Sequence, residues 1–228
     1  MGKIKKNNQK NQNKRKKQNN IIIISVICFI LLLIVSFGFL IRSSFQHNSV
    51  SDADKMNREL SRYIEHKHIP SFGKGDTHVV VIADYRCPDC HRFRKDVYKP
   101  YLEQYINNDT IKYTEVEFPV VDDKSYDYAH MADAINQLNN KELSKEFREI
   151  AYQKSITDNN VEKTLKRTSI NGKDFKQVMK FYNKHHTQSR TDKKRLEMLG
   201  INETPTIFIN GERVAQDDVV KKIKQITK

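Results

Sequence analysis

Hydrophobic residues along the chain form one long run, a few short runs and several stretches of helical spacing. The long run, residues 21–41, contains no charged residue. A helix over this segment is long enough to cross the hydrocarbon core of a bilayer, which is about 30 Å thick. The pattern therefore predicts an N-terminal transmembrane anchor. Because no small-residue cleavage site follows it, we expect an uncleaved signal-anchor.

The segment before this run predicts the orientation of the anchor. Eight of the 13 net positive charges lie within residues 1–17, without any acidic residue among them. By the positive-inside rule, we expect residues 1–20 to be a basic cytoplasmic tail and the chain from residue 42 onward to be extracytoplasmic. The rest of the chain carries a net charge of only +5, which is ordinary for a globular domain, so we expect no nucleic-acid partner.

The first part of the extracytoplasmic chain combines a polar stretch with one helix and the start of an α/β pattern. Residues 42–75 predict a stalk and a short helix, the latter over residues 55–67. The nearly continuous apolar run 78–83 predicts a buried central strand. Residues 76–121 are completed by a second strand over 111–118 and by a helix between the strands, whose apolar positions are Phe93, Val97, Tyr101, Tyr105 and Ile106.

Residues 122–199 show helical spacing without a strand pattern, and residues 200–228 return to strands. In the first of these segments we expect helices over 126–138, 141–152, 161–165, 175–182 and 191–199, the last of them ended by Gly200. In the second we expect a strand over 206–210, a type I′ turn at Asn210-Gly211, a strand over 213–215 and a helix capped by Asp217. The order predicts one α/β domain whose sheet is divided by an all-helical insertion.

Cysteine usage restricts the chemistry. Cys28 lies within the apolar run, whereas Cys87 and Cys90 form a Cys-Pro-Asp-Cys sequence after the first strand. Such a pair can belong to a zinc site, a structural disulfide or a redox centre. A structural zinc site needs four ligands, and no further cysteine is available for one. The adjacent residues His185-His186 would point in different directions on a helix and seldom bind one metal. A disulfide across four residues stabilises little. Redox chemistry remains, and we expect no metal and no cofactor beyond a reversible disulfide.

Two segments resemble those of a known family. Asp84-Tyr85-Arg86-Cys87-Pro88-Asp89-Cys90 lies at a strand-to-helix junction, and residues 200–211 carry Thr204-Pro205 before the hairpin. Over about residues 75–228 the chain is similar to the DsbA-like thiol-disulfide oxidoreductases, particularly the membrane-anchored BdbD proteins of Gram-positive bacteria. The resemblance implies a thioredoxin-like fold. It also implies a cis bond at Thr204-Pro205, opposite the cysteines, whose backbone binds an extended substrate segment.

The position of the cysteines on the helix suggests their roles. Cys87 is the expected attacking sulfur, because unpaired amides and the helix dipole favour its thiolate, and Cys90 is the expected resolving thiol. Pro88 suits the first helical turn. The carboxylate of Asp89 would repel the thiolate and weaken the oxidant. Asp84 either exchanges a proton with Cys90 or is an exposed or helix-capping acid near the turn, and both alternatives stay open.

The resemblance and the predicted anchor together indicate an extracytoplasmic enzyme. We expect it to introduce disulfide bonds into reduced, unfolded secreted or surface proteins and to be recharged by a DsbB-like quinone-linked membrane oxidase. A reductase or isomerase of the same fold is one alternative. A membrane-tethered copper chaperone that uses the cysteine pair is another.

Overall fold

The described part of the chain begins after the predicted membrane segment. The structure is a computed structural model that describes residues 52–155, 157, 160–184 and 188–227. The predicted tail 1–20 and anchor 21–41 lie outside these residues. Among the residues described, none forms a helix that is both long enough and apolar enough to cross a bilayer.

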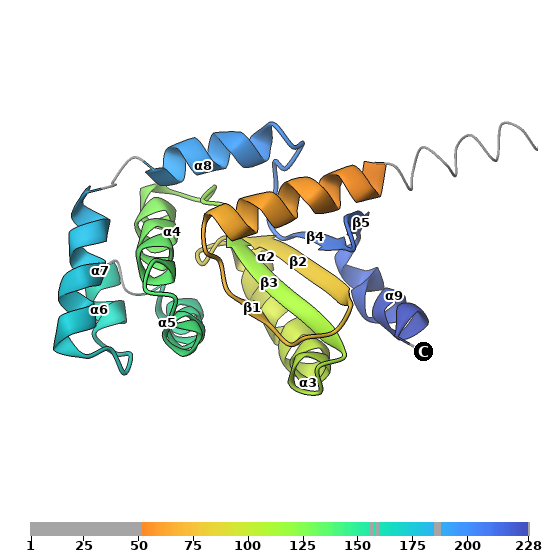
Figure 1. The fold of residues 1–228 in the computed structure, drawn as a ribbon, viewed down its shortest axis with the longest axis horizontal. Helices are drawn as coiled ribbons and strands as arrows, with labels where there is room; N and C mark the ends of the chain where they lie inside the picture. The colour runs from red at the N-terminus through yellow and green to blue at the C-terminus, as the bar shows by residue number, and fades with distance from the viewer. Residues whose placement is uncertain (1–51, 156, 158–159, 185–187, 228) are drawn as a thin grey trace, which may run out of the picture. The chain divides into compact units, whose positions relative to one another are not determined.

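In the described chain, one mixed sheet forms the centre of the fold, with the strand order β1-β3-β2-β4-β5 (Figure 1). The strands are β1 Ser71–Phe72, β2 Thr77–Ala83, β3 Ile111–Glu117, β4 Thr206–Ile209 and β5 Glu212–Val214. The central strand β2 runs parallel to β3 and antiparallel to β4. All seven of its residues are buried, so the predicted central strand is confirmed.

Helices pack around this sheet, and the chain between β3 and β4 is mainly helical. After β2 come α2 Pro88–Phe93, the π-helix Arg94–Leu102 and α3 Glu103–Asn107. The insertion contains α4 Asp123–Asn136, α5 Lys141–Lys154, α6 Val161–Leu165, α7 Gly172–Lys184 and α8 Gln188–Glu197. The turn Gln216–Asp218 and α9 Val219–Ile226 close the chain. The predicted helical insertion is therefore present, with helix ends displaced by a few residues.

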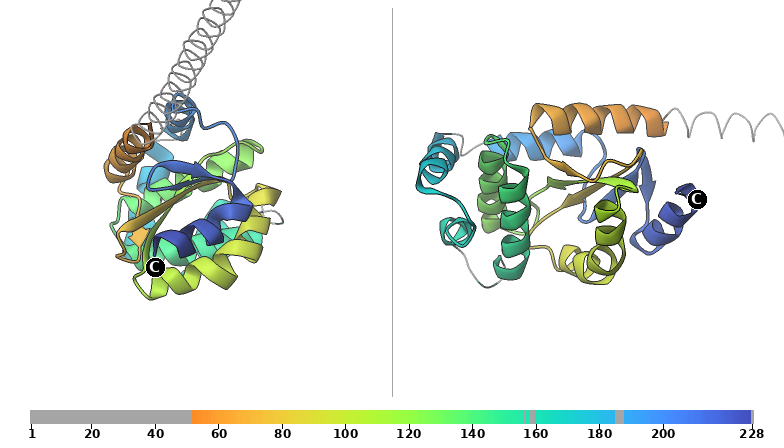
Figure 2. Two further views of the ribbon diagram at one scale, coloured as in Figure 1. Left: turned by 90° about the vertical axis from the view of Figure 1, so that its right-hand side faces the viewer. Right: turned by 60° about the horizontal axis from the view of Figure 1, so that its bottom comes forward.

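The alternation of side chains along β2 separates two hydrophobic cores. Val79 and Val81 face the larger core, to which α2, α4, α5 and α9 contribute. Val80 and Ile82 face the smaller core, which holds Leu60 from a helix over residues 52–66 and the end of α8. Figure 2 shows this helix and α8 on the face of the sheet opposite α9. Both faces of β2 are thus covered, as a continuous apolar strand requires.

Residues 52–75, assigned from the sequence to a stalk and short helix, contribute to the folded unit. β1 pairs with β3. Lys67, which follows the helix over residues 52–66, places its ammonium 2.9 Å from Asp133 on α4 and 2.5 Å from Asp192 on α8. Burial alone would lower the pKa of Lys67, but these two carboxylates raise it above its ordinary value. This buried cluster links the end of the helix over residues 52–66 to α4 and α8 of the helical insertion.

The helix after the cysteines differs from its prediction. Its middle section, Arg94–Leu102, is a π-helix that contains Pro100. Proline removes one backbone donor and clashes with the preceding turn of an α-helix, and the wider π turn accommodates this defect. The change of phase buries Tyr98 and leaves Tyr101, one of the apolar positions at helical spacing, 45% exposed.

The C-terminal hairpin has the predicted tight turn, but the helix after it begins differently from its prediction. Asn210 and Gly211 have φ values of 50° and 82°, as the predicted type I′ turn requires. A Cβ atom on Gly211 would meet the Ala53 carbonyl at 1.9 Å, so this turn also needs glycine for close packing. The predicted cap at Asp217 is wrong, because Asp217 lies within the preceding turn and Asp218 holds the N-cap position without a side-chain bond.

A buried ionic network lies where β3 faces α5. The Arg148 guanidinium is 3.3 Å from Glu115 and 3.7 Å from Glu117. The Tyr85 hydroxyl donates to Glu117 over 2.7 Å. Burial raises the pKa of Glu117 to about 7, and Arg148 opposes this shift by stabilising the carboxylate. Arg148 therefore compensates two acidic side chains inside the fold.

Replacing Arg148 with alanine tests this network. We expect the free energy of unfolding to fall by about 3–5 kcal/mol, because the substitution leaves buried carboxylates without their cation. The matched control is Arg62→Ala, which removes an exposed arginine paired with Glu59 and should cost less than about 1 kcal/mol. Chemical denaturation of the full chain in detergent measures both. Equal losses in the two variants would show that the network adds no specific stability.

Candidate active site around Cys87 and Cys90

Cys87 and Cys90 lie at the point where β2 gives way to α2. Cys87 occupies the N-cap position of α2 in extended conformation, and Pro88 takes the first helical turn, where its missing amide donor has no cost. Both cysteines are free thiols. Cys87 is 7% exposed and Cys90 is 1% exposed. Cys87 is therefore the more accessible sulfur, and Cys90 lies one turn deeper.

The two thiols have pKa values shifted in opposite directions. The pKa of Cys87 is lowered to about 6, chiefly because the Cys90 thiol donates a hydrogen bond to its sulfur. The Thr204 hydroxyl and the amides of Cys90 and Asp89 lower it further, against the effect of burial. The pKa of Cys90 is raised, because its thiol donates to Cys87 and because it is buried. At neutral pH the site thus holds a Cys87 thiolate beside a Cys90 thiol.

The loop before β4 covers the cysteines. Its Thr204-Pro205 peptide bond is cis. In its protonated form the Cys87 thiol donates to the Thr204 carbonyl over 3.4 Å, so this backbone lies beside the Cys87 sulfur. Within the described residues, the buried Thr204 hydroxyl makes no hydrogen bond of regular geometry, yet it lies near enough to Cys87 to lower that pKa. This hydroxyl is therefore available to a thiolate.

The acid between the cysteines points away from them. Asp89 is exposed and forms an ion pair with Arg92, one turn further along α2. Its repulsion of the Cys87 thiolate is reduced by this neighbouring cation and by solvent. His91 turns toward the preceding loop, where its Nε2 atom lies 2.7 Å from the Tyr85 carbonyl oxygen and its ring packs edge-on against Tyr152.

Asp84 is buried and accepts hydrogen bonds from three backbone amides. One carboxylate oxygen accepts from Arg86 over 2.8 Å. The other accepts from Val120 over 2.8 Å and from Val121 over 3.1 Å. The carboxylate thus ties the loop after β2 to the loop after β3. Asp84 is thus not the exposed acid that the sequence left open, and it does not cap α2; its proton exchange with Cys90 stays a prediction.

The helical insertion contributes residues that sequence reasoning missed. The Ser155 hydroxyl, at the end of α5, donates to the Tyr85 carbonyl, and the Ser155 backbone carbonyl accepts from the Arg86 guanidinium. Arg86 also pairs with Asp122 over 3.0 Å. The ring of Tyr85 packs against Tyr152, with 5.2 Å between ring centroids. No local pattern identifies Ser155, because tertiary packing alone brings it to this loop.

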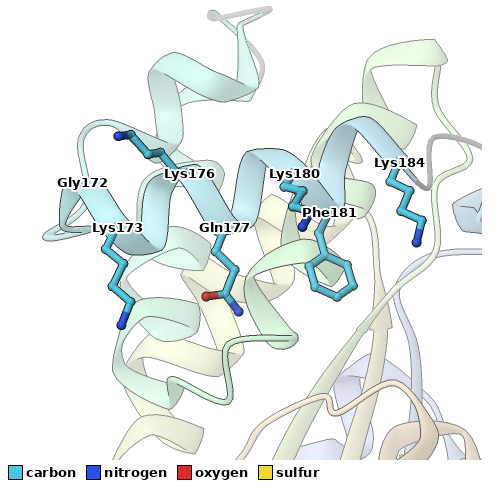
Figure 3. Close-up of a pocket in the computed structure, with 7 residues that line it drawn as sticks. All are labelled: Gly172, Lys173, Lys176, Gln177, Lys180, Phe181 and Lys184. Carbon is cyan, nitrogen blue, oxygen red and sulfur yellow. The ribbon is translucent and has the colours of Figure 1, made fainter.

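The described residues outside the cysteine site were compared with the predicted absence of a metal and with the hollows of the surface, and neither adds a residue to the site. In the described part of the chain, no group of three histidine, cysteine, aspartate or glutamate side chains is arranged to hold a metal ion, and His185-His186 lies outside that part. A hollow on α7 is shown in Figure 3. Its lining residues are Gly172, Lys173, Lys176, Gln177, Lys180, Phe181 and Lys184. None of them belongs to the cysteine site.

Thr204→Val tests whether the hydroxyl stabilises the thiolate. In the unchanged chain, alkylation of Cys87 should follow a titration with a midpoint near pH 6, and Cys90 should resist alkylation. Valine preserves the shape but removes the donor, so the midpoint should rise by up to about one pH unit. The control is Thr77→Val, at the far end of β2. An unchanged midpoint in Thr204→Val would show that the hydroxyl leaves the thiolate unaffected.

The same shift predicts how pH changes the stability of the reduced protein. Because the folded pKa of Cys87 lies below its unfolded value, the thiolate stabilises the fold fully above the unfolded pKa. This contribution shrinks as pH falls and is lost through about pH 6. The difference in unfolding free energy between unchanged chain and Cys87→Ser, both reduced, should therefore narrow from pH 9 to pH 5. Denaturant titrations at several pH values measure it, and a constant difference would contradict the shift.

Comparisons with known proteins agree with this geometry. A family model described as thioredoxin matches residues 67–228. The structure of oxidised BdbD from Bacillus subtilis aligns with a TM-score of 0.58 at 20% identity, covering 71% of this chain and 94% of that one. The thiol-disulfide exchange protein α-DsbA2 from Wolbachia pipientis aligns with a TM-score of 0.58 at 21% identity, covering 77% and 98%.

A third structure shares the same fold. Reduced DsbA from Mycobacterium tuberculosis aligns with a TM-score of 0.54 at 16% identity, covering 66% of this chain and 82% of that one. A search of curated protein sequences finds no match. The resemblance inferred from the sequence is confirmed by the family model and by these folds. The chain belongs to the thioredoxin family and shares its α/β fold with the structures of BdbD and DsbA.

Proposed function

We propose that the chain is an extracytoplasmic thiol-disulfide oxidoreductase that introduces disulfide bonds into reduced, unfolded secreted or surface proteins. One observation carries the proposal: the pKa of accessible Cys87 is lowered to about 6 while the pKa of buried Cys90 is raised, beside a cis-proline loop. An attacking sulfur must be a good leaving thiolate, and a resolving thiol must stay protonated until it acts. Membership of the thioredoxin family supports the same chemistry.

The reaction proceeds by two exchanges at sulfur. A substrate thiolate attacks Cys87 in the Cys87–Cys90 disulfide, so a bond to Cys87 forms and Cys90 leaves as a thiolate that takes up a proton. A second substrate thiolate then attacks the substrate sulfur of this mixed disulfide and releases Cys87 as its stabilised thiolate. The substrate loses two electrons and gains a disulfide, and the cysteine pair gains the two electrons.

The next cycle requires an electron acceptor. A DsbB-like membrane oxidase would take two electrons from the reduced pair and pass them, with two protons, to a quinone. The predicted anchor over residues 21–41 would keep the domain at the membrane where such a partner resides. The Thr204 backbone beside Cys87 is the proposed contact for an extended substrate segment, since strand-like pairing requires no particular side-chain sequence.

Stabilisation of the Cys87 thiolate supports the oxidising direction. A lower thiolate pKa stabilises the reduced state and makes the disulfide a stronger oxidant. The value near 6 lies between those typical of thioredoxin, about 7, and of DsbA, about 3.5. The outward ion pair of Asp89 with Arg92 removes much of the repulsion expected from an acid at this position.

Cysteine substitutions test the assignment of roles. Cys87→Ser should abolish oxidation of a dithiol peptide, because the variant cannot form the Cys87–Cys90 disulfide that accepts the two electrons. Cys90→Ala should instead trap the enzyme-substrate complex when a peptide disulfide is supplied, because the resolving thiol is missing. Mass spectrometry of full-length protein under non-reducing conditions distinguishes these species. Turnover by Cys87→Ser would rule out the proposed mechanism.

A redox titration against glutathione tests the direction. We expect the full chain in detergent to have a reduction potential between about −270 mV, the value for thioredoxin, and about −120 mV, the value for DsbA. The fraction of reduced Cys87–Cys90 is measured by alkylation and mass spectrometry. A potential at or below that of thioredoxin would favour a reductase and contradict the oxidase proposal.

A further inference from the structure

A tight turn leads from β2 into α2, and Cys87 is its last residue. The Cys87 amide donates to the Asp84 carbonyl over 3.1 Å, so residues 84–87 form a hydrogen-bonded β-turn. Inside the turn, the Asp84 carboxylate accepts from the Arg86 amide over 2.8 Å. At the far end, the Cys87 carbonyl accepts from the His91 amide over 3.1 Å. The position of Cys87 therefore depends on the geometry of this turn.

The Tyr85 carbonyl, at the second position of the turn, accepts two hydrogen bonds from side chains. The Nε2 atom of His91 lies 2.7 Å from this oxygen. Because a carbonyl oxygen can only accept, this nitrogen carries the proton. The Ser155 hydroxyl donates to the same oxygen. A carbonyl oxygen has two lone pairs, so these two donors use its full capacity. The turn is thus held both by α2 and by the helical insertion.

The end of α5 supports the ring of His91 as well. The ring packs edge-on against Tyr152, with 5.2 Å between ring centroids. Tyr152 and the C-cap residue Ser155 are three residues apart, which places them on one face of the helix end. Both are buried. The Tyr152 ring also contacts the ring of Tyr85 at 5.2 Å. One buried face of α5 therefore contacts both partners of the hydrogen bond from His91.

Charge explains the placement of His91 less well than this hydrogen bond does. In the part of the chain that the structure describes, His91 forms no ion pair. Asp89, two residues before it, pairs with Arg92, and Asp84 accepts from backbone amides. The His91 ring instead meets a neutral carbonyl, to which a neutral imidazole can donate. His91 can therefore act on the turn without carrying a charge.

We propose that His91 is a positioning residue for Cys87. Its ring and the Ser155 hydroxyl hold the Tyr85 carbonyl in place, and the turn thereby keeps the Cys87 sulfur beside the first amides of α2. The inference rests on the proposed function and adds two residues to its site, one of them in the insertion. Amides at a helix start stabilise a thiolate only while the sulfur stays next to them. A loosened turn would weaken this stabilisation.

Two substitutions of His91 separate the hydrogen bond from the aromatic ring and from the charge. In His91→Phe, a ring can still pack against Tyr152, but the donor is missing. In His91→Gln, the side-chain amide can donate in place of Nε2, without a ring and without a positive charge. The measurement is the pH midpoint for alkylation of Cys87 in the reduced full chain in detergent. Mass spectrometry of the peptide that carries the cysteine pair keeps Cys28 out of the signal.

His91→Phe should raise the midpoint by about 0.5–1 pH unit, as expected for the loss of one hydrogen bond of ordinary net strength. His91→Gln should keep the midpoint of the unchanged chain. His66→Phe is the matched control, because His66 is exposed on the helix over residues 52–66, and it should leave the midpoint unchanged. Equal rises in both His91 variants would assign the effect to the imidazole itself and overturn the inference. An unchanged midpoint in His91→Phe would also overturn it.

Ser155→Ala tests whether both donors act through the same carbonyl. This variant should raise the midpoint in the same direction as His91→Phe. The two substitutions together should raise it by less than the sum of the single shifts, because a turn loosened by one loss has little order left to lose. Fully additive shifts would show two independent effects and overturn the shared role of the Tyr85 carbonyl.

Oxidation of a dithiol peptide separates this inference from the proposed function. Oxidised full chain in detergent is mixed with the peptide in a single turnover, which removes the need for a recharging partner. A tryptophan in the peptide reports the reaction, because the chain itself contains none. If the unchanged chain does not oxidise the peptide, the proposed function fails, and the alkylation midpoints still decide the role of His91. If it does so while His91→Phe keeps the original midpoint, the function stands and the positioning role is excluded.

Discussion

Strand β2 must be paired along both edges and covered on both faces, and the rest of the fold follows from this constraint. Its seven residues are all buried, so every backbone group needs a partner within the sheet. β3 and β4 supply these partners, and the two cores cover the two rows of side chains. Because β2 ends where α2 begins, the same arrangement brings three separate loops around Cys87.

Charge is distributed unevenly around this end of the sheet. A neighbouring thiol, a hydroxyl and backbone amides lower the pKa of Cys87, and together they outweigh the opposing effect of its burial. The nearby acids are each engaged elsewhere: Asp84 by amides, Asp89 by Arg92 and Glu117 by the Tyr85 hydroxyl. Negative charge can therefore reside on Cys87 in a neighbourhood that contains several carboxylates.

The features predicted from sequence are those encoded locally. The apolar run of β2, the Cys-Pro-Asp-Cys sequence at a helix start and the Asn-Gly turn each carry their signal within a few residues. The π-helix was missed because Pro100 alters the phase of a helix whose apolar spacing looks regular. Glu115 and Glu117 gave no sign of burial, since their partner Arg148 lies on a distant helix. Ser155 reaches the loop before Cys87 only through the packing of α5, which spacing along the chain does not reveal.

The outer strands of the sheet have a consequence for how the protein meets other chains. β1 contains two residues and β5 contains three, so neither edge offers a long row of free backbone groups. β5 also carries Glu212 and Arg213, each paired with a neighbouring side chain of opposite charge. Short, charged edges resist the addition of a foreign strand and so protect against aggregation. A protein with such edges can remain monodisperse in a crowd of unfolded polypeptides, since its own sheet is a poor template for their association.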